Sequence, residues 1–135
     1  LARAMDQSGL AAWIGGVVAS LDTVPVIVII AVVATLVIFL TEVTSNTATS
    51  TMAMPIMAGA AMGLGMEPLL VMTTAGLAAS MAFMLPVATP PNAIVFASGY
   101  ITIPQMSRAG IWLNILAIVL ITTVATLLIP IVLIG

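Results

Sequence analysis

The 135-residue chain is 63% hydrophobic and carries only two arginines and four acidic residues. An ordinary soluble domain is about 45–50% apolar and about 25% charged, so these few charges cannot cover a globule in water. From Asp22 onward the charges are separated or followed by uncharged stretches of 19, 24, 40 and 27 residues. A bilayer-crossing helix needs roughly 20 mostly apolar residues. The sequence therefore predicts an all-α integral membrane protein in contact with the lipid bilayer.

The residue types that are missing exclude most enzyme chemistry. The chain has no cysteine, histidine or lysine, so it has no thiolate, no side-chain base poised near neutral pH and no amine for a Schiff base. Two arginines make no basic patch for nucleic acid. We therefore expect no enzyme, no organic cofactor and no nucleic-acid partner. Hard oxygen ligands remain, and these suit alkali cations.

Residues 1–20 are the most polar part of the chain, with large apolar side chains at roughly helical spacing. This pattern favours a short interfacial helix with Trp13 at headgroup depth, although a frayed linker is the alternative. The chain begins at Leu1 without an initiator methionine, so we expect a fragment of a longer protein.

Residues 22–65 are predicted to form a re-entrant helical hairpin. An apolar run from Val24 to Leu40 is followed by the polar segment Thr41–Thr51, which contains no glycine or proline, and then by a second apolar run that ends near Gly63 and Gly65. Both runs are short for a full crossing. At such a tip one helix ends with unpaired carbonyls, and the next begins with unpaired N–H groups that Ser45, Asn46 or Thr47 can cap. A continuous polar-faced helix and a span followed by an aqueous loop are the alternatives.

Residues 67–102 are predicted to form one helix broken at membrane depth. A first part, 69–85, precedes the segment 86–92, in which Pro90 and Pro91 cannot donate hydrogen bonds to the carbonyls of Pro86 and Val87. We expect a new helix near Pro91 that exposes the N–H groups of Asn92 and its successors, whereas a simple kink is the alternative.

The last predicted span occupies residues 108–135, preceded by a polar connection that contains Pro104 and Arg108. Earlier in the chain, Gly59 and Gly63 have the GxxxG spacing that permits close helix contact. Two interrupted helices with free carbonyls and free N–H groups are devices of secondary transporters, which bind a coupling cation and an anionic substrate in this way.

Two motifs carry a more specific signal. FLTEVTSNTATST begins at Phe39, and FMLPVATPPNAIVF follows from Phe83. In this order they resemble the C-terminal inverted repeat of the divalent anion/sodium symporter family, the sodium-dicarboxylate cotransporters. Members carry di- and tricarboxylates and some carry sulfate, and their S-N-T signature occurs twice. Only one copy, Ser45-Asn46-Thr47, is present here, so half of the expected site is absent from this chain.

The resemblance also implies roles for individual residues. Asn46 and Thr47 would contact a substrate carboxylate, and we add Ser45 and Thr89 as substrate-binding candidates. A sodium ion would lie among five residues, partly bound by backbone oxygens: Thr41, Thr44, Asn46, Ala88 and Pro90. Thr44 stands where some relatives have a smaller residue, which matters little for a backbone ligand. Glu42 and Asn92 are accessory candidates.

Glu42 is the only charge between Thr23 and Met66, and an acid inside a membrane is a functional candidate. It either supplies charge to the cation or holds the hairpin by hydrogen bonds. In the first case Glu42→Gln should weaken sodium coupling; in the second it should pass unnoticed.

The predicted function is sodium-coupled symport of di- or tricarboxylates such as succinate, malate or citrate. A related carrier of sulfate, citrate or arsenite with another coupling ion, and a non-transporting membrane scaffold, are the alternatives. The expected partners are a divalent anion, sodium, a missing N-terminal repeat and a second copy of the full-length protein. The expected location is the bacterial inner membrane, as a multi-pass protein.

Overall fold

The computed structural model describes Gly9, residues 24–129 and residues 131–132. The interfacial helix expected over residues 1–20 therefore lies, apart from Gly9, outside the described residues. All regular structure in the described part is helical, which agrees with the predicted all-α class. The helices are α3 (Val26–Thr41), α4 (Asn46–Gly63), α5 (Pro68–Ala78), α6 (Pro90–Ala97) and α7 (Ile103–Leu127).

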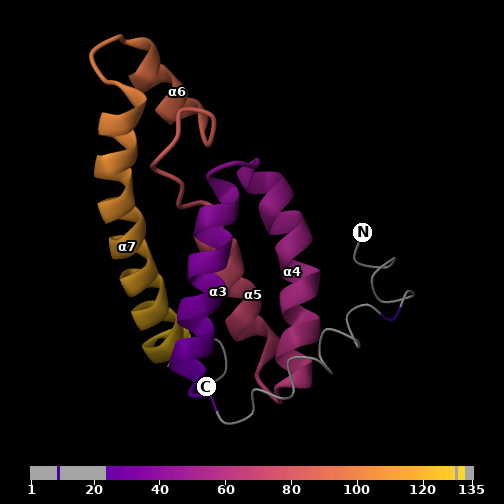
Figure 1. Cartoon of the computed structure of the whole chain (residues 1–135). Coiled ribbons are helices and arrows are strands. Elements are labelled where there is room, and N and C mark those ends of the chain that lie inside the picture. Colours follow the sequence, from indigo (N-terminus) through magenta and orange to yellow (C-terminus); the bar gives the residue numbers. More distant parts are fainter. Residues whose placement is uncertain (1–8, 10–23, 130, 133–135) are drawn as a thin grey trace.

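Helices α3 and α4 form an antiparallel hairpin (Figure 1). Its turn spans only residues 42–45, because Asn46 to Thr51 already belong to α4. The threonines tolerate this position because their hydroxyls bond within the helix, as in the contact of Thr51 Oγ1 with the Thr47 carbonyl at 2.7 Å. The polar segment is therefore a short turn followed by the start of a helix.

Helix α4 ends where the glycines predict. Gly65 has a φ of +64°, and the N–H of Met66 donates to the carbonyl of Ala61 at 2.9 Å while that of Gly65 donates to Met62 at 3.3 Å. These two bonds define a Schellman cap, which needs a residue in the left-handed region and so favours glycine.

Two predicted boundaries are wrong. Helix α5 ends at Ala78 instead of continuing to Leu85, and residues 79–89 lie outside helices until α6 begins at Pro90. Helix α7 begins at Ile103, so Pro104 and Arg108 lie within it rather than in a connection. The reason at α7 is local, because Thr102 and Gln105 form a capping box and proline fits the first turn of a helix.

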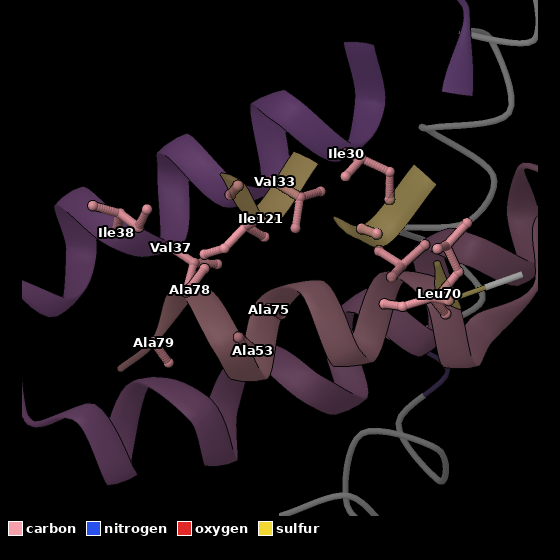
Figure 2. Close-up of a cluster of buried hydrophobic side chains, with 14 of the residues drawn as sticks. Ile30, Val33, Val37, Ile38, Ala53, Leu70, Ala75, Ala78, Ala79 and Ile121 are labelled. Atoms are coloured by element: carbon pink, nitrogen blue, oxygen red, sulfur yellow. The ribbon is translucent and has the colours of Figure 1, made fainter. Parts of the chain in front are cut away.

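The core lies where α3, α5 and α7 pack against one another, with α4 against α5. Figure 2 shows Val33 and Val37 of α3 facing small residues of α5 such as Ala75 and Ala78, with Ile121 of α7 beside them. Small side chains on α5 let neighbouring helices approach closely, which is how helices associate in lipid.

Of the described helices, only α7 is both long and apolar enough to cross a membrane, whereas α3 and α5 are apolar but shorter. The outward faces of α3 and α7 carry large exposed apolar side chains, among them Leu36 and Trp112. This distribution agrees with a protein surrounded by lipid.

Candidate ion and anion site at the helix breaks

The tip of the hairpin and the segment before α6 meet at one end of the bundle (Figure 1). Between them lies an open cleft of about 600 Å³. The cleft is lined from the hairpin by Val43, Thr44, Ser45, Asn46 and Thr47, and from the other side by Pro86, Val87, Ala88, Thr89, Pro90 and Ala93. Seven of the predicted binding residues therefore line one cleft, although the two motifs are some forty residues apart in sequence.

The α3 end of the tip presents free carbonyl oxygens. Among the described residues, no hydrogen bond ends on the backbone carbonyls of Glu42, Val43 or Thr44. The Thr44 hydroxyl instead donates back to the Leu40 carbonyl at 2.8 Å. A helix C-terminus carries partial negative charge, so this side of the tip favours a cation.

The α4 end of the tip presents free N–H groups. Ser45 is the N-cap residue, but its side chain makes no capping hydrogen bond, so the expected cap by Ser45, Asn46 or Thr47 is wrong. The Ser45 carbonyl accepts the N–H of Thr49 at 2.8 Å, because that bond closes the first helical turn. The N–H groups of Asn46, Thr47 and Ala48 are left without a helical partner, which is the usual arrangement for holding an anion.

The segment 86–88, shortly before α6, presents backbone carbonyls that have no hydrogen-bond partner among the described residues. No hydrogen bond in the described part of the chain reaches the carbonyls of Pro86, Val87 or Ala88, as expected from the two prolines. The exposed N–H predicted at Asn92 is wrong, because it donates to Thr89 Oγ1 at 3.3 Å. Thr89 accepts that bond as the N-cap residue, and its own hydroxyl proton remains available to a ligand.

Thr41 lies beneath the cleft instead of lining it. Its side chain has no exposed surface, and its hydroxyl lies 2.7 Å from Asn46 Oδ1 and 3.0 Å from the Ala79 carbonyl. Thr41 thereby orients the Asn46 side chain and connects the end of α3 with the end of α5.

Glu42 and Asn92 also lie outside the cleft lining, and they explain why α5 ends early. The buried Glu42 carboxylate accepts the backbone N–H groups of Phe83 at 2.8 Å, Met84 at 3.0 and 3.1 Å, and Leu85 at 3.1 Å. The Asn92 amide donates to the carbonyls of Ala82 and Leu85, both at 3.0 Å. These side chains replace the helical hydrogen bonds that residues 82–85 give up.

Sequence reasoning missed the part that α7 plays in this network. Asn114 is fully buried and its Nδ2 donates to Glu42 Oε1 at 2.8 Å. Gly110, one turn earlier, lies directly against the backbone of Phe83 and Met84. An asparagine in the otherwise apolar run 109–121 was the available signal, since polar groups in membrane helices usually have a partner.

The cleft lining combines neutral oxygen acceptors and neutral N–H donors. None of its lining side chains is titratable, and no group of three or more His, Cys, Asp or Glu residues is found in the described ranges. Carbonyl and hydroxyl oxygens match an alkali cation, and helix N–H groups match a carboxylate or sulfate.

Comparison with known proteins identifies the family. The family model described as the sodium:sulfate symporter transmembrane region matches residues 1–134. The sodium-dependent dicarboxylate transporter SdcS of Staphylococcus saprophyticus is 48% identical over 130 residues, which cover 96% of this chain and 25% of that protein. The SdcS protein of Staphylococcus aureus strain MRSA252 is 50% identical over 133 residues, which cover 98% of this chain and 26% of that protein. The chain thus spans about a quarter of the length of these relatives. This confirms the resemblance drawn from the two motifs, and the chain belongs to the sodium:sulfate symporter transmembrane region family.

Proposed function

We propose that this chain supplies one side of the binding site of a sodium-coupled symporter for dicarboxylates in a bacterial membrane. The observation that carries the proposal is the cleft between the hairpin tip and residues 86–90, whose lining residues include ones with free carbonyls and ones with free helix N–H groups. The relatives named as sodium-dependent dicarboxylate transporters support this choice of cation and anion.

In this proposal sodium binds at the carbonyl-rich part of the cleft. Residues 86–88 offer three carbonyls without hydrogen-bond partners in the described part of the chain, and the end of α3 offers those of Val43 and Thr44. The Thr44 hydroxyl and the Asn46 side chain lie beside them on the cleft wall. The sodium ligands implied by the resemblance are consistent with this arrangement, with Thr41 acting from below through Asn46.

The anion binds at the start of α4. Its donors are the backbone N–H groups of Asn46 and Thr47, the Ser45 hydroxyl, which makes no capping bond, and the Thr89 hydroxyl. No arginine or lysine lines the cleft, so the negative charge of the substrate is offset by the helix N-terminus and by the neighbouring sodium. Binding of each ion therefore strengthens binding of the other, which is the thermodynamic basis of symport.

The position of Asn114 supports a site deep in the membrane. Asn114 lies near the middle of the 25-residue helix α7 and contacts Glu42 at the hairpin tip. At about 1.5 Å per residue α7 is about 37 Å long, enough to span a hydrocarbon core of about 30 Å. If α7 spans the bilayer, the hairpin tip lies near its midplane, which supports a re-entrant hairpin of a transporter repeat.

The proposal is tested in a full-length transporter that carries these residues, reconstituted in vesicles. Asn46→Ala and Thr47→Ala should each lower sodium-driven succinate uptake at least about tenfold, since the first removes the amide beside the proposed sodium position and the second removes a hydroxyl of a residue that lines the cleft. Thr51→Ala is the matched control, because Thr51 lies one turn further along α4 and bonds only to the Thr47 carbonyl among the described residues. Near-normal uptake in both cleft variants at matched expression would refute the proposal.

Sulfate is the second candidate substrate, because the matching family description names it. Helix N–H groups bind either anion. Excess unlabelled sulfate should leave succinate uptake unchanged if the site prefers a dicarboxylate, and should abolish it if sulfate is the substrate.

A further inference from the structure

Helix α7 lies closely against residues 79–89, the non-helical segment between α5 and α6, at Gly110. A Cβ atom at Gly110 would lie 2.6 Å from Met84 Cα and from the carbonyl carbon of Phe83. These are backbone atoms, so only glycine permits this approach. Asn114 follows on the same face one turn later, and its side chain bonds to Glu42.

Glu42 is the point at which three parts of the molecule meet. Its Oε1 accepts from Phe83, Met84 and Asn114, and its Oε2 accepts from Met84 and Leu85. The carboxylate thus joins the hairpin tip, the segment after α5 and the middle of α7. Buried hydrogen bonds to a charged group are among the stronger ones in proteins.

This junction borders both walls of the cleft without being part of either. Val43, the next residue after Glu42, belongs to the hairpin wall, and Pro86, the next after Leu85, belongs to the opposite wall. The separation of the two walls therefore depends on the bonds that hold Glu42 to residues 83–85. Asn114 holds Glu42 in the orientation that makes those bonds.

We propose that Asn114 is a positioning residue for the cation and anion site, acting through Glu42, and that Gly110 allows α7 to approach closely enough for it to do so. This inference rests on the proposed function for its transport consequence but not for its structural one. Asn114 does not reach the cleft, so its removal should change the affinity for sodium more than the maximal rate.

Thr122 supplies the matched control. It lies two turns after Asn114 on α7 and is also buried, but its hydroxyl has no hydrogen-bond partner among the described residues. Asn114→Ala and Thr122→Ala both truncate a buried polar side chain of the same helix, and only the first removes a bond to Glu42.

The first test is amide hydrogen exchange in the purified full-length protein. Asn114→Ala should accelerate exchange of the peptide that contains Phe83, Met84 and Leu85 about tenfold, because these amides are protected by Glu42 and local opening becomes easier. Thr122→Ala should leave that peptide at the wild-type rate. Equal exchange in the two variants would overturn the inference, whether or not the protein transports anything.

The second test is succinate uptake as a function of sodium concentration. Asn114→Ala should raise the sodium concentration at half-maximal uptake at least about threefold, with the maximal rate within about twofold of wild type. A loss of maximal rate with unchanged half-saturation would show a general packing role and overturn the inference. A wild-type protein without sodium-dependent uptake would refute the proposed function alone, because the exchange experiment would still decide the role of Asn114.

Discussion

Glu42 shows how a single side chain can organise a site that it does not enter. Among the described residues its hydrogen-bond partners are all N–H groups, three from the backbone of residues 83–85 and one from Asn114. Both oxygens therefore act as acceptors, a pattern that an amide cannot reproduce because one of its two polar atoms carries hydrogens.

This geometry changes what Glu42→Gln tests. From the sequence we expected Glu42→Gln to be tolerated if Glu42 only holds the hairpin by hydrogen bonds. In the structure an NH₂ group in place of Oε2 would leave the N–H of Leu85 without its acceptor, and one in place of Oε1 would leave those of Phe83 and Asn114 without theirs. We expect a loss of about 1–3 kcal/mol of stability and a clear drop in succinate uptake.

The same substitution at an exposed site controls this prediction. Glu67 is exposed at the start of α5 and its side chain makes no capping bond, so Glu67→Gln should keep the wild-type melting temperature in detergent. If Glu42→Gln melts and transports like Glu67→Gln, the hydrogen-bond account of Glu42 is wrong.

At this scale the sequence could identify candidates but not their partners. Glu42 stood out as an isolated acid, and seven of the predicted binding residues do line the cleft. The backbone partners of Glu42 lie 41 to 43 residues away along the chain and Asn114 lies 72 residues away. A backbone N–H group is present in nearly every residue, so the sequence cannot show which of them bind Glu42. Thr41 was named from the family resemblance as a sodium ligand and Asn92 as an accessory candidate, but their bonds to Asn46, Ala82 and Leu85 could only be seen in three dimensions.

At the scale of elements, the two helix breaks have different origins. The start of α6 is determined by the local sequence, because Pro90 and Pro91 cannot donate helical hydrogen bonds and Thr89 caps the new helix. The end of α5 is not, because residues 79–85 contain neither glycine nor proline and are mostly apolar. Tertiary bonds to Glu42 and Asn92 override their helical tendency, which is why the predicted boundary at Leu85 failed.

The local origin of the second break makes a prediction about the prolines. In a Pro90→Ala, Pro91→Ala double variant the new N–H groups can pair with the carbonyls of Pro86 and Val87, and α6 can extend backward. These carbonyls face the cleft in our proposal. We expect a raised sodium concentration at half-maximal uptake, with the fold retained.

Pro104→Ala is the control for that double variant. Pro104 lies in the first turn of α7, where an N–H has no helical partner and a proline costs little. Circular dichroism should show no loss of helix in either protein. An unchanged sodium dependence in the double variant would mean that the prolines only bend the chain and do not keep carbonyls free.

At the scale of the whole molecule, the hairpin tip and the segment before α6 form the two walls of an open cleft. The cleft is lined by both polar and apolar residues, carries no charged side chain and lies level with the middle of α7. Polar backbone groups that face lipid without partners cost several kcal/mol each. Such a surface is stable only against protein or water, and the relatives are about four times as long as the part that this chain matches.

The last prediction concerns this one-sided site. A dicarboxylate has two charged ends, and a single helix N-terminus at α4 offers strong donors to only one of them. Alternating access also requires one part of a transporter to move against another. We therefore expect these 135 residues, reconstituted alone in vesicles, to show no sodium-dependent succinate uptake. Co-expression with the remaining three quarters of the S. aureus relative should restore uptake, and an Asn46→Ala variant of this chain should abolish the restored activity. Sodium-driven uptake by the purified chain alone would show that two copies can form a complete site between them.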